Sequence, residues 1–256
     1  MRTIDFSEIL FNALQYSGND RHNINSETFA QFRDFISARM REVWEMEEWP
    51  DLCRVAEFTT IIDPVTNVPY FTPITNVDVL GVFNKNPQTT SRAVELNYQL
   101  YGTGTSTRII LDTNAHATGW YYYRVPFRPL LGDLWDSSIP YFQNAQAYYD
   151  AGSASATYTP VAGRPHNGNF YFLNAVSATA GNLPTTSSWS RISIPYIFGN
   201  YCAWGAAANW LVSEGQLQEA AGLDGKAQSM IQIELDKILK QMNQNGKIKF
   251  FNPYKS

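Results

Sequence analysis

The sequence predicts an α+β fold, in which N- and C-terminal helices pack as a bundle around an inserted antiparallel β domain and a small β-rich insertion. Three observations carry this prediction. Apolar residues recur at helical spacing near both ends of the 256-residue chain. The middle alternates short strand-like runs with Pro and Gly. Between the strand-like middle and the C-terminal helices lies a stretch almost free of charge. Hydrophobic residues make up 44% of the chain, enough for a sizeable core.

The N-terminal quarter is predicted to be helical. Asp5 and Glu8 have the spacing of a capping box, and Gly18 is a plausible stop for the first helix. Ser26 is a candidate cap for a second helix, which Trp49-Pro50 should end because the residue before Pro avoids the α region. The apolar positions that recur every three or four residues in this second helix are Phe29, Phe32, Ile36, Met40, Val43 and Trp44.

Residues 55–132 are predicted to form a β domain, either a sandwich or a small barrel. Runs such as "VDVLGVF", "TRIILD" and "GWYYYRVPF" are rich in residues that favour strands, and Pro and Gly separate them. Successive side chains of a strand point to opposite faces. We therefore expect Tyr122 to face away from Tyr121 and Tyr123, so that the three rings do not form one platform.

Residues 133–194 are predicted to form a small β-rich insertion. The run "LLGDLWDSSIPYFQNAQAYYDAGS", in which this insertion begins, fits either a short helix or a loop. Between Ser137 and Ile194 the only formal charges are Asp150, Arg164 and Arg191.

Helices return after Pro195. "YIFGNYCAWGAAANWLVSEGQ" is rich in Ala and aromatic residues, and Gly222 and Gly225 bracket a predicted break. A last helix should then end near Gly246, before the extended tail "KIKFFNPYKS". Segments 1–54 and 195–256 together are predicted to form the helical bundle. The last helix carries one apolar stripe: Ala227, Ile231, Leu235, Ile238 and Met242.

Composition excludes some functions. The formal net charge of −4 and a pI near 5.4 disfavour a free-standing nucleic-acid binder, which would carry a basic patch. Two cysteines, Cys53 and Cys202, do not make a disulfide framework and favour a reducing compartment. The N-terminus lacks the apolar core of a signal peptide, and the most apolar run is too short to span a bilayer. We expect a soluble protein made in the cytoplasm.

The search for catalytic chemistry finds no strong candidate. His22, His116 and His166 lack partners at metal-ligand spacing, and the sequence has no nucleotide-binding or nucleophile-elbow motif. Asp133 and Asp136 flank Trp135, and two carboxylates in a loop cap turns more often than they catalyse. We therefore expect no enzyme, no cofactor and no metal.

Three patches together resemble a known class of protein. They are "FAQFRDFISARMREVWEMEEWPDL", "DVLGVFNKNPQTTSRAVELNYQL…GWYYYRVPFRPL" and "ISIPYIFGNYCAWGAAANWLVSEGQLQEAAGLDGKAQSMIQIELDKILKQ". Helical ends around a β domain are similar to the head-to-tail adaptor, or connector, proteins of tailed phages. The resemblance covers most of the chain, and its motifs are structural.

This resemblance implies a virion protein of the capsid–tail junction, assembled in the host cytoplasm. It would form a homo-oligomeric ring of about 12 copies, which requires a heterologous interface that closes. Its partners would be the portal protein and the next neck or tail protein. It would also contact the viral DNA, transiently and without sequence preference. No membrane partner is expected. The tail is a candidate docking segment or a frayed terminus. Its candidate interface residues are Phe250, Phe251 and Tyr254 as anchors and Lys247 and Lys249 as charges.

A second resemblance concerns the insertion, from "AYYDAGSASATY" through "GNFYFLNAVSATAGNLPTTSSWSRI". It is similar to small chitin-binding carbohydrate modules, whose order of Tyr, Gly and Trp it follows at Tyr149, Gly152, Gly168, Tyr171, Pro184 and Trp189. The candidate glycan contacts are Trp189, Tyr171 and Tyr149, which fit the core of the insertion equally well. The alternative function is therefore a tail or neck component that binds glycans of the host surface.

Overall fold

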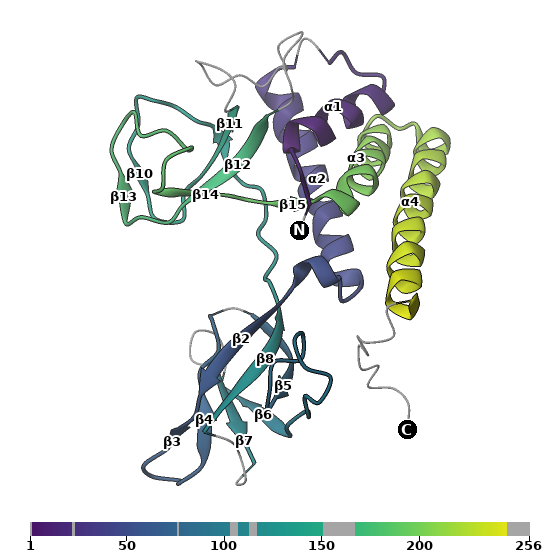
Figure 1. Ribbon diagram of the computed structural model, residues 1–256. Coiled ribbons are helices and arrows are strands. Elements are labelled where there is room, and N and C mark those ends of the chain that lie inside the picture. Colours follow the sequence, from purple (N-terminus) through teal and green to yellow (C-terminus); the bar gives the residue numbers. More distant parts are fainter. Residues whose placement is uncertain are drawn as a thin grey trace. The chain divides into compact units, whose positions relative to one another are not determined.

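A computed structural model describes residues 2–21, 24–75, 77–102, 107–112, 117–150 and 167–244 (Figure 1). The chain divides into two compact units. Unit 1 comprises Met1–Met46 and Arg128–Lys237, and unit 2 comprises Glu47–Phe127 and Ile238–Ser256. The described residues combine helices with mostly antiparallel sheets, as the predicted α+β class requires. None of the described helices is both long and apolar enough to cross a membrane.

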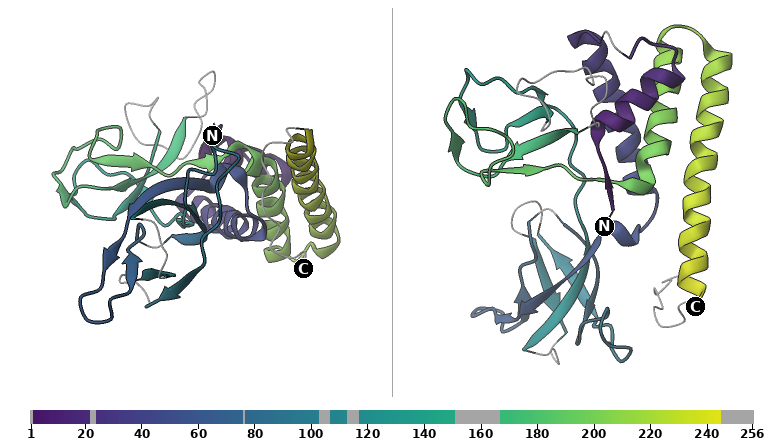
Figure 2. Two further views of the ribbon diagram at one scale, coloured as in Figure 1. Left: turned by 60° about the horizontal axis from the view of Figure 1, so that its bottom comes forward. Right: turned by 45° about the horizontal axis from the view of Figure 1, so that its top comes forward.

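Unit 1 contains the helices from both ends of the chain. Helix α3 packs against α1 and α2, so segments nearly 200 residues apart share one core (Figure 2). The helices are α1 (Phe6–Tyr16), α2 (Ser26–Met46), the short η3 (Tyr196–Phe198), α3 (Gly199–Ser213) and, as far as Lys237, α4 (Leu217–Gln244). The first residues also pair with the strand before α3, through β1 (Thr3–Ile4) and β15 (Ile194–Pro195).

Two predicted caps differ in the structure. Asp5 precedes α1, but its carboxylate does not cap the helix; it accepts from the Asn169 amide at 2.9 Å and pairs with Arg191 at 2.7 Å. Asn25, not Ser26, caps α2, because its side-chain oxygen accepts from the Thr28 N–H at 2.7 Å. In both cases the polar contact differs from the predicted one, while the helix itself is present as predicted.

The predicted break at Gly222 and Gly225 is wrong, because α4 runs through both residues. The break lies earlier, at Gly215, whose φ of 79° is accessible to glycine at little cost. The Gln216 N–H donates to Leu211 O at 2.8 Å and the Gly215 N–H to Val212 O at 3.1 Å, which is the Schellman ending of α3.

Unit 1 also contains the insertion predicted for residues 133–194. Its run of residues 130–150, left open between helix and loop, contains short strands. The main sheet has the order β14-β12-β11-β9, and β10 pairs with β13 beside it. These strands are β9 (Asp133–Leu134), β10 (Tyr141–Phe142), β11 (Gln146–Asp150), β12 (Gly168–Leu173), β13 (Ser177–Ala178) and β14 (Trp189–Arg191).

The alternation of side chains along β11 and β12 explains why this sheet joins the helices. Tyr148 and Phe170 lie opposite each other in register and point to the same face. On that face Tyr148 lies 5.0 Å from the ring of Phe29, and Phe170 lies 4.8 Å from the ring of Phe6. One face of the sheet therefore packs on α1 and α2, so the insertion is part of the same core as the helices.

Unit 2 contains the predicted β domain, which begins earlier and ends earlier than residues 55–132. A three-stranded sheet, β2-β8-β5, faces a four-stranded sheet, β3-β4-β7-β6. The elements are η1 (Pro50–Leu52), β2 (Cys53–Thr59), β3 (Ile61–Ile62), β4 (Pro69–Phe71), β5 (Asp78–Phe83), β6 (Tyr98–Tyr101), β7 (Arg108–Leu111) and β8 (Thr118–Arg124).

The two sheets of unit 2 are joined at both edges. On one side the chain passes from β2 into β3 at Thr60. On the other side the Leu96 N–H donates to Val82 O of β5 at 2.7 Å, and the same segment continues into β6. The core between the sheets draws on both: Phe58, Phe71, Val82, Ile109, Leu111 and Tyr121. The result is a barrel-like unit, one of the two predicted forms.

Candidate functional site

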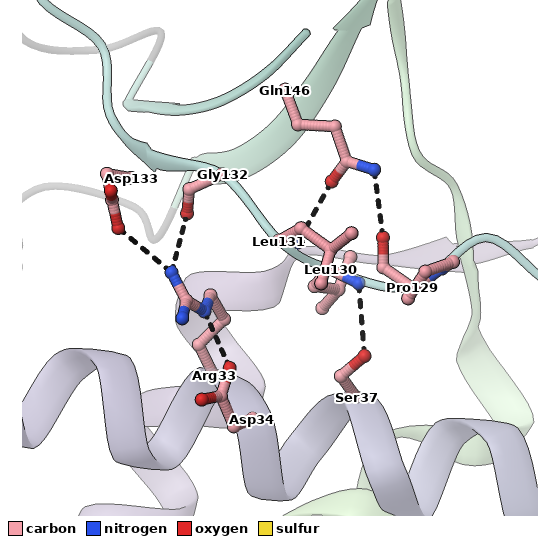
Figure 3. Close-up of polar contacts among 9 residues, drawn as sticks. All are labelled: Arg33, Asp34, Ser37, Pro129, Leu130, Leu131, Gly132, Asp133 and Gln146. Carbon is pink, nitrogen blue, oxygen red and sulfur yellow. Dashed lines mark hydrogen bonds and ion pairs between the residues drawn. The ribbon is translucent and has the colours of Figure 1, made fainter. Parts of the chain in front are cut away.

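A polar cluster ties the chain after Arg128 to helix α2 (Figure 3). The Arg33 guanidinium donates to the Gly132 carbonyl at 3.2 Å and pairs with Asp133 at 2.9 Å and Asp34 at 2.8 Å. The Ser37 hydroxyl accepts from the Leu130 N–H at 3.0 Å, where both groups are buried. Polar backbone groups of this loop therefore find their hydrogen-bond partners in side chains of α2.

Gln146 completes the cluster from the sheet side. Its side-chain oxygen accepts from the Leu131 N–H and its nitrogen donates to the Pro129 carbonyl, each at 3.0 Å (Figure 3). At Gly132 a Cβ would lie 2.6 Å from the Gln146 backbone, so only glycine fits. The contacts fix the insertion on the helices, which is a structural role.

Asp133 and Asp136 make separate contacts, one with helix α2 and one within its own loop. Asp133 faces Arg33, and Asp136 accepts from both the Ser138 N–H and the Ser138 hydroxyl at 2.7 Å. These bonds hold the pKa of the Asp136 carboxyl below its usual value. Among the described residues, no group of three or more His, Cys, Asp and Glu is arranged to hold a metal.

The three candidate glycan contacts are core residues in the structure. Trp189, Tyr171 and Tyr149 are each less than 10% exposed and share one cluster. The Trp189 indole N–H donates to Asn182 at 3.0 Å. Stacking on a sugar requires an exposed ring face, and these rings are covered by protein. The geometry therefore favours the core alternative. The other members of the cluster are Tyr141, Ala147, Leu173 and Ala178.

An exposed apolar pair lies on the same insertion. Phe142 is 70% exposed and Val176 is 78% exposed. Both lie at one end of the β10–β13 pair: Phe142 pairs with Ser177, and Val176 lies opposite Gln143, whose N–H donates to Val176 O at 3.0 Å. Sequence patterns do not indicate that these two residues are exposed, since a two-residue strand is too short to show alternation.

A second exposed apolar group lies on unit 2, at the hairpin between β3 and β4. Ile61 is 53%, Ile62 is 54% and Val65 is 90% exposed. The tip is held by Asp63, whose carboxylate accepts from the N–H groups of Val65 and Thr66 at 2.9 and 3.1 Å. These bonds lower the pKa of Asp63. The hairpin thus presents apolar side chains to solvent on an ordered backbone.

An ionic network joins the helices of unit 1. Arg39 of α2 pairs with Glu42 at 3.3 Å and with Asp224 of α4 at 2.7 Å, and donates to Asn209 of α3 at 2.8 Å. The Tyr201 hydroxyl donates to Glu42 at 3.0 Å. A Cβ at Gly205 would lie 2.8 Å from the Arg39 side chain, so the glycine of α3 makes room for it.

The two cysteines are buried and free. Burial raises the pKa of both thiols, most strongly for Cys202. Both are therefore thiols at neutral pH, which suits packing. The remaining candidates lie outside the described residues: His22, His116, His166 and the tail residues Lys247, Lys249, Phe250, Phe251 and Tyr254.

The sequence matches no protein-family model and no curated protein.

Proposed function

We propose that the chain is a phage virion structural protein, a subunit of the head-to-tail adaptor ring that joins the portal to the tail and lines the DNA passage. The proposal rests on the resemblance of its three patches and on one structural observation, the exposed apolar side chains of both units. The helices of the two chain ends would form the bundle of the subunit, with the β unit inserted between them.

The exposed apolar side chains support a subunit with neighbours on more than one side. The Phe142–Val176 pair belongs to unit 1 and the Ile61–Ile62–Val65 hairpin to unit 2. Exposed apolar groups rimmed by polar residues mark interaction surfaces in soluble proteins. A ring subunit needs two different lateral surfaces and further surfaces for the rings above and below.

The balance of basic and acidic residues in the chain is also compatible with a passage through which a DNA duplex can slide. Tight binding of DNA requires many Lys and Arg contacts to phosphate. The chain carries 19 such residues against 23 acidic ones. Any DNA contact would therefore be weak and independent of sequence.

Gold labelling of intact phage particles with an antibody to this protein tests the proposal. Label at the junction of capsid and tail is expected. Label at the distal tail, or absence of the protein from purified particles, would refute it.

One observation favours the alternative, a tail or neck component that binds a glycan. Phe142 is exposed, as are the next two residues, Gln143 and Asn144, in a stretch of sequence almost free of charge. An open aromatic face with neighbouring amides suits a neutral sugar. If the alternative is right, the wild-type protein binds an insoluble polysaccharide and Phe142→Ala does not, while Val176→Ala binds normally. Wild-type protein that fails to bind excludes it.

A further inference from the structure

Two glycines inside helix α4 have no steric reason to be glycine. At Gly222 and at Gly225 an added Cβ would meet nothing within 4 Å, and neither residue has a positive φ. A glycine in a helix interior favours the unfolded conformation about fivefold relative to alanine. Two of them within one turn make residues 222–225 the place where α4 opens most easily.

A further contact weakens the same turn. The Ser229 hydroxyl donates to the Gly225 carbonyl at 2.8 Å, four residues earlier. Such a bond competes with the helical N–H for this carbonyl and often bends helices. The sequence predicted a break at this point, and the structure shows an intact helix.

Contacts of α4 on each side of Gly225 are few and partly polar. Asp224 pairs with Arg39, and the Lys226 ammonium lies 4.8 Å from the ring centre of Trp204 on α3. Among the α4 side chains that the structure describes, up to Lys240, the buried apolar ones are Ala220, Ala227 and Ile231, two of which are small. Little apolar area therefore holds α4 in place beyond the glycines.

The lengths of the helices leave part of α4 beyond α3. Helix α4 has 28 residues and α3 has 15, and the two run side by side (Figures 1 and 2). At about 1.5 Å per residue, α4 exceeds α3 by roughly 20 Å. In this later part Ile233 is 47% exposed and Leu239 is 54% exposed.

We infer that α4 contains a hinge at Gly222–Gly225, held closed by the Arg39–Asp224 ion pair. In the open state the helix breaks at the glycines, and the part from Lys226 onward leaves α3. Opening does not strand the buried guanidinium, because Arg39 keeps Glu42 and Asn209 as partners. The hinge is a property of the single chain and does not depend on the proposed function.

Hydrogen exchange of the full-length protein, followed by mass spectrometry, tests the hinge. We expect residues 226–240 of the wild type to exchange faster than α1 and α3. Gly222→Ala combined with Gly225→Ala should slow this exchange about 25-fold, the product of about fivefold for each glycine, and leave α1 and α3 unchanged. Asp224→Asn should speed it two- to fivefold.

The matched control for the ion pair is Asp236→Asn, on the same helix, whose carboxylate accepts from the Gln232 amide of its own helix at 3.3 Å. It should leave the exchange of residues 226–240 as in the wild type. The inference is overturned if α4 exchanges as slowly as α3 in the wild type. It is also overturned if the double alanine variant changes nothing, or slows all of unit 1 equally.

Discussion

Replacement of Trp189 by alanine separates a core role of this residue from a binding role. Trp189 is 5% exposed, its ring lies 5.2 Å from that of Tyr141, and its indole N–H is bonded to Asn182. Removing a buried tryptophan lowers the free energy of unfolding by about 3–5 kcal/mol. Asn182 keeps a donor in the Thr186 hydroxyl, so the lost hydrogen bond leaves no orphaned acceptor. We expect the loss to come from the cavity.

Equilibrium urea unfolding followed by circular dichroism measures this loss. At an m-value of about 2 kcal/mol/M, the midpoint should fall by about 2 M. Trp189→Phe keeps most of the ring and should lose less. Phe142→Ala, at a position 70% exposed, should stay within about 0.5 kcal/mol of the wild type. A Trp189→Ala protein as stable as the wild type would refute the core assignment and return this residue to the candidate glycan contacts.

Three further predictions follow from buried groups. Gly168→Ala should destabilise unit 1 severely, because the new Cβ would collide with the buried Tyr148 ring, and thermal unfolding should show a large drop in Tm. Cys53 and Cys202 should not react with a thiol reagent at pH 8 until the protein is unfolded, since burial raises both pKa values; prompt reaction of the native protein would contradict this. Burial raises the pKa of Tyr201 to about 12 from 10, so between these pH values the unfolded chain binds fewer protons than the folded one. Stability should fall there by up to about 1.4 kcal/mol per pH unit, and Tyr201→Phe should reduce the slope measured in urea.

Several elements of the fold could be predicted from local patterns in the sequence. The spacing of apolar residues identified α1 and α2 because it depends only on neighbours along the helix. The facing of the three tyrosines followed in the same way from strand geometry. The ring centroids of Tyr121 and Tyr123 lie 5.3 Å apart, and Tyr121 is in the core of unit 2.

Features that depend on distant residues could not be predicted. Gly215 and Gly222 look alike in the sequence, yet Gly215 follows the end of α3 and Gly222 lies inside α4. The joining of the two sheets through β2–β3 and Leu96 depends on pairing between distant strands. For the same reason the sequence left open whether Trp189 lies in a core or on a surface, and it gave no sign that Phe142 is exposed.

The proposed function requires that copies of this chain form a ring at the head-to-tail junction. Cryo-electron microscopy of intact phage particles tests it most directly, because each copy should be recognisable by its helices and its β unit. We expect a closed ring of copies next to the portal, with DNA or an open channel at its centre. Density for this chain only at the distal tail, or at no position in the particle, would contradict it.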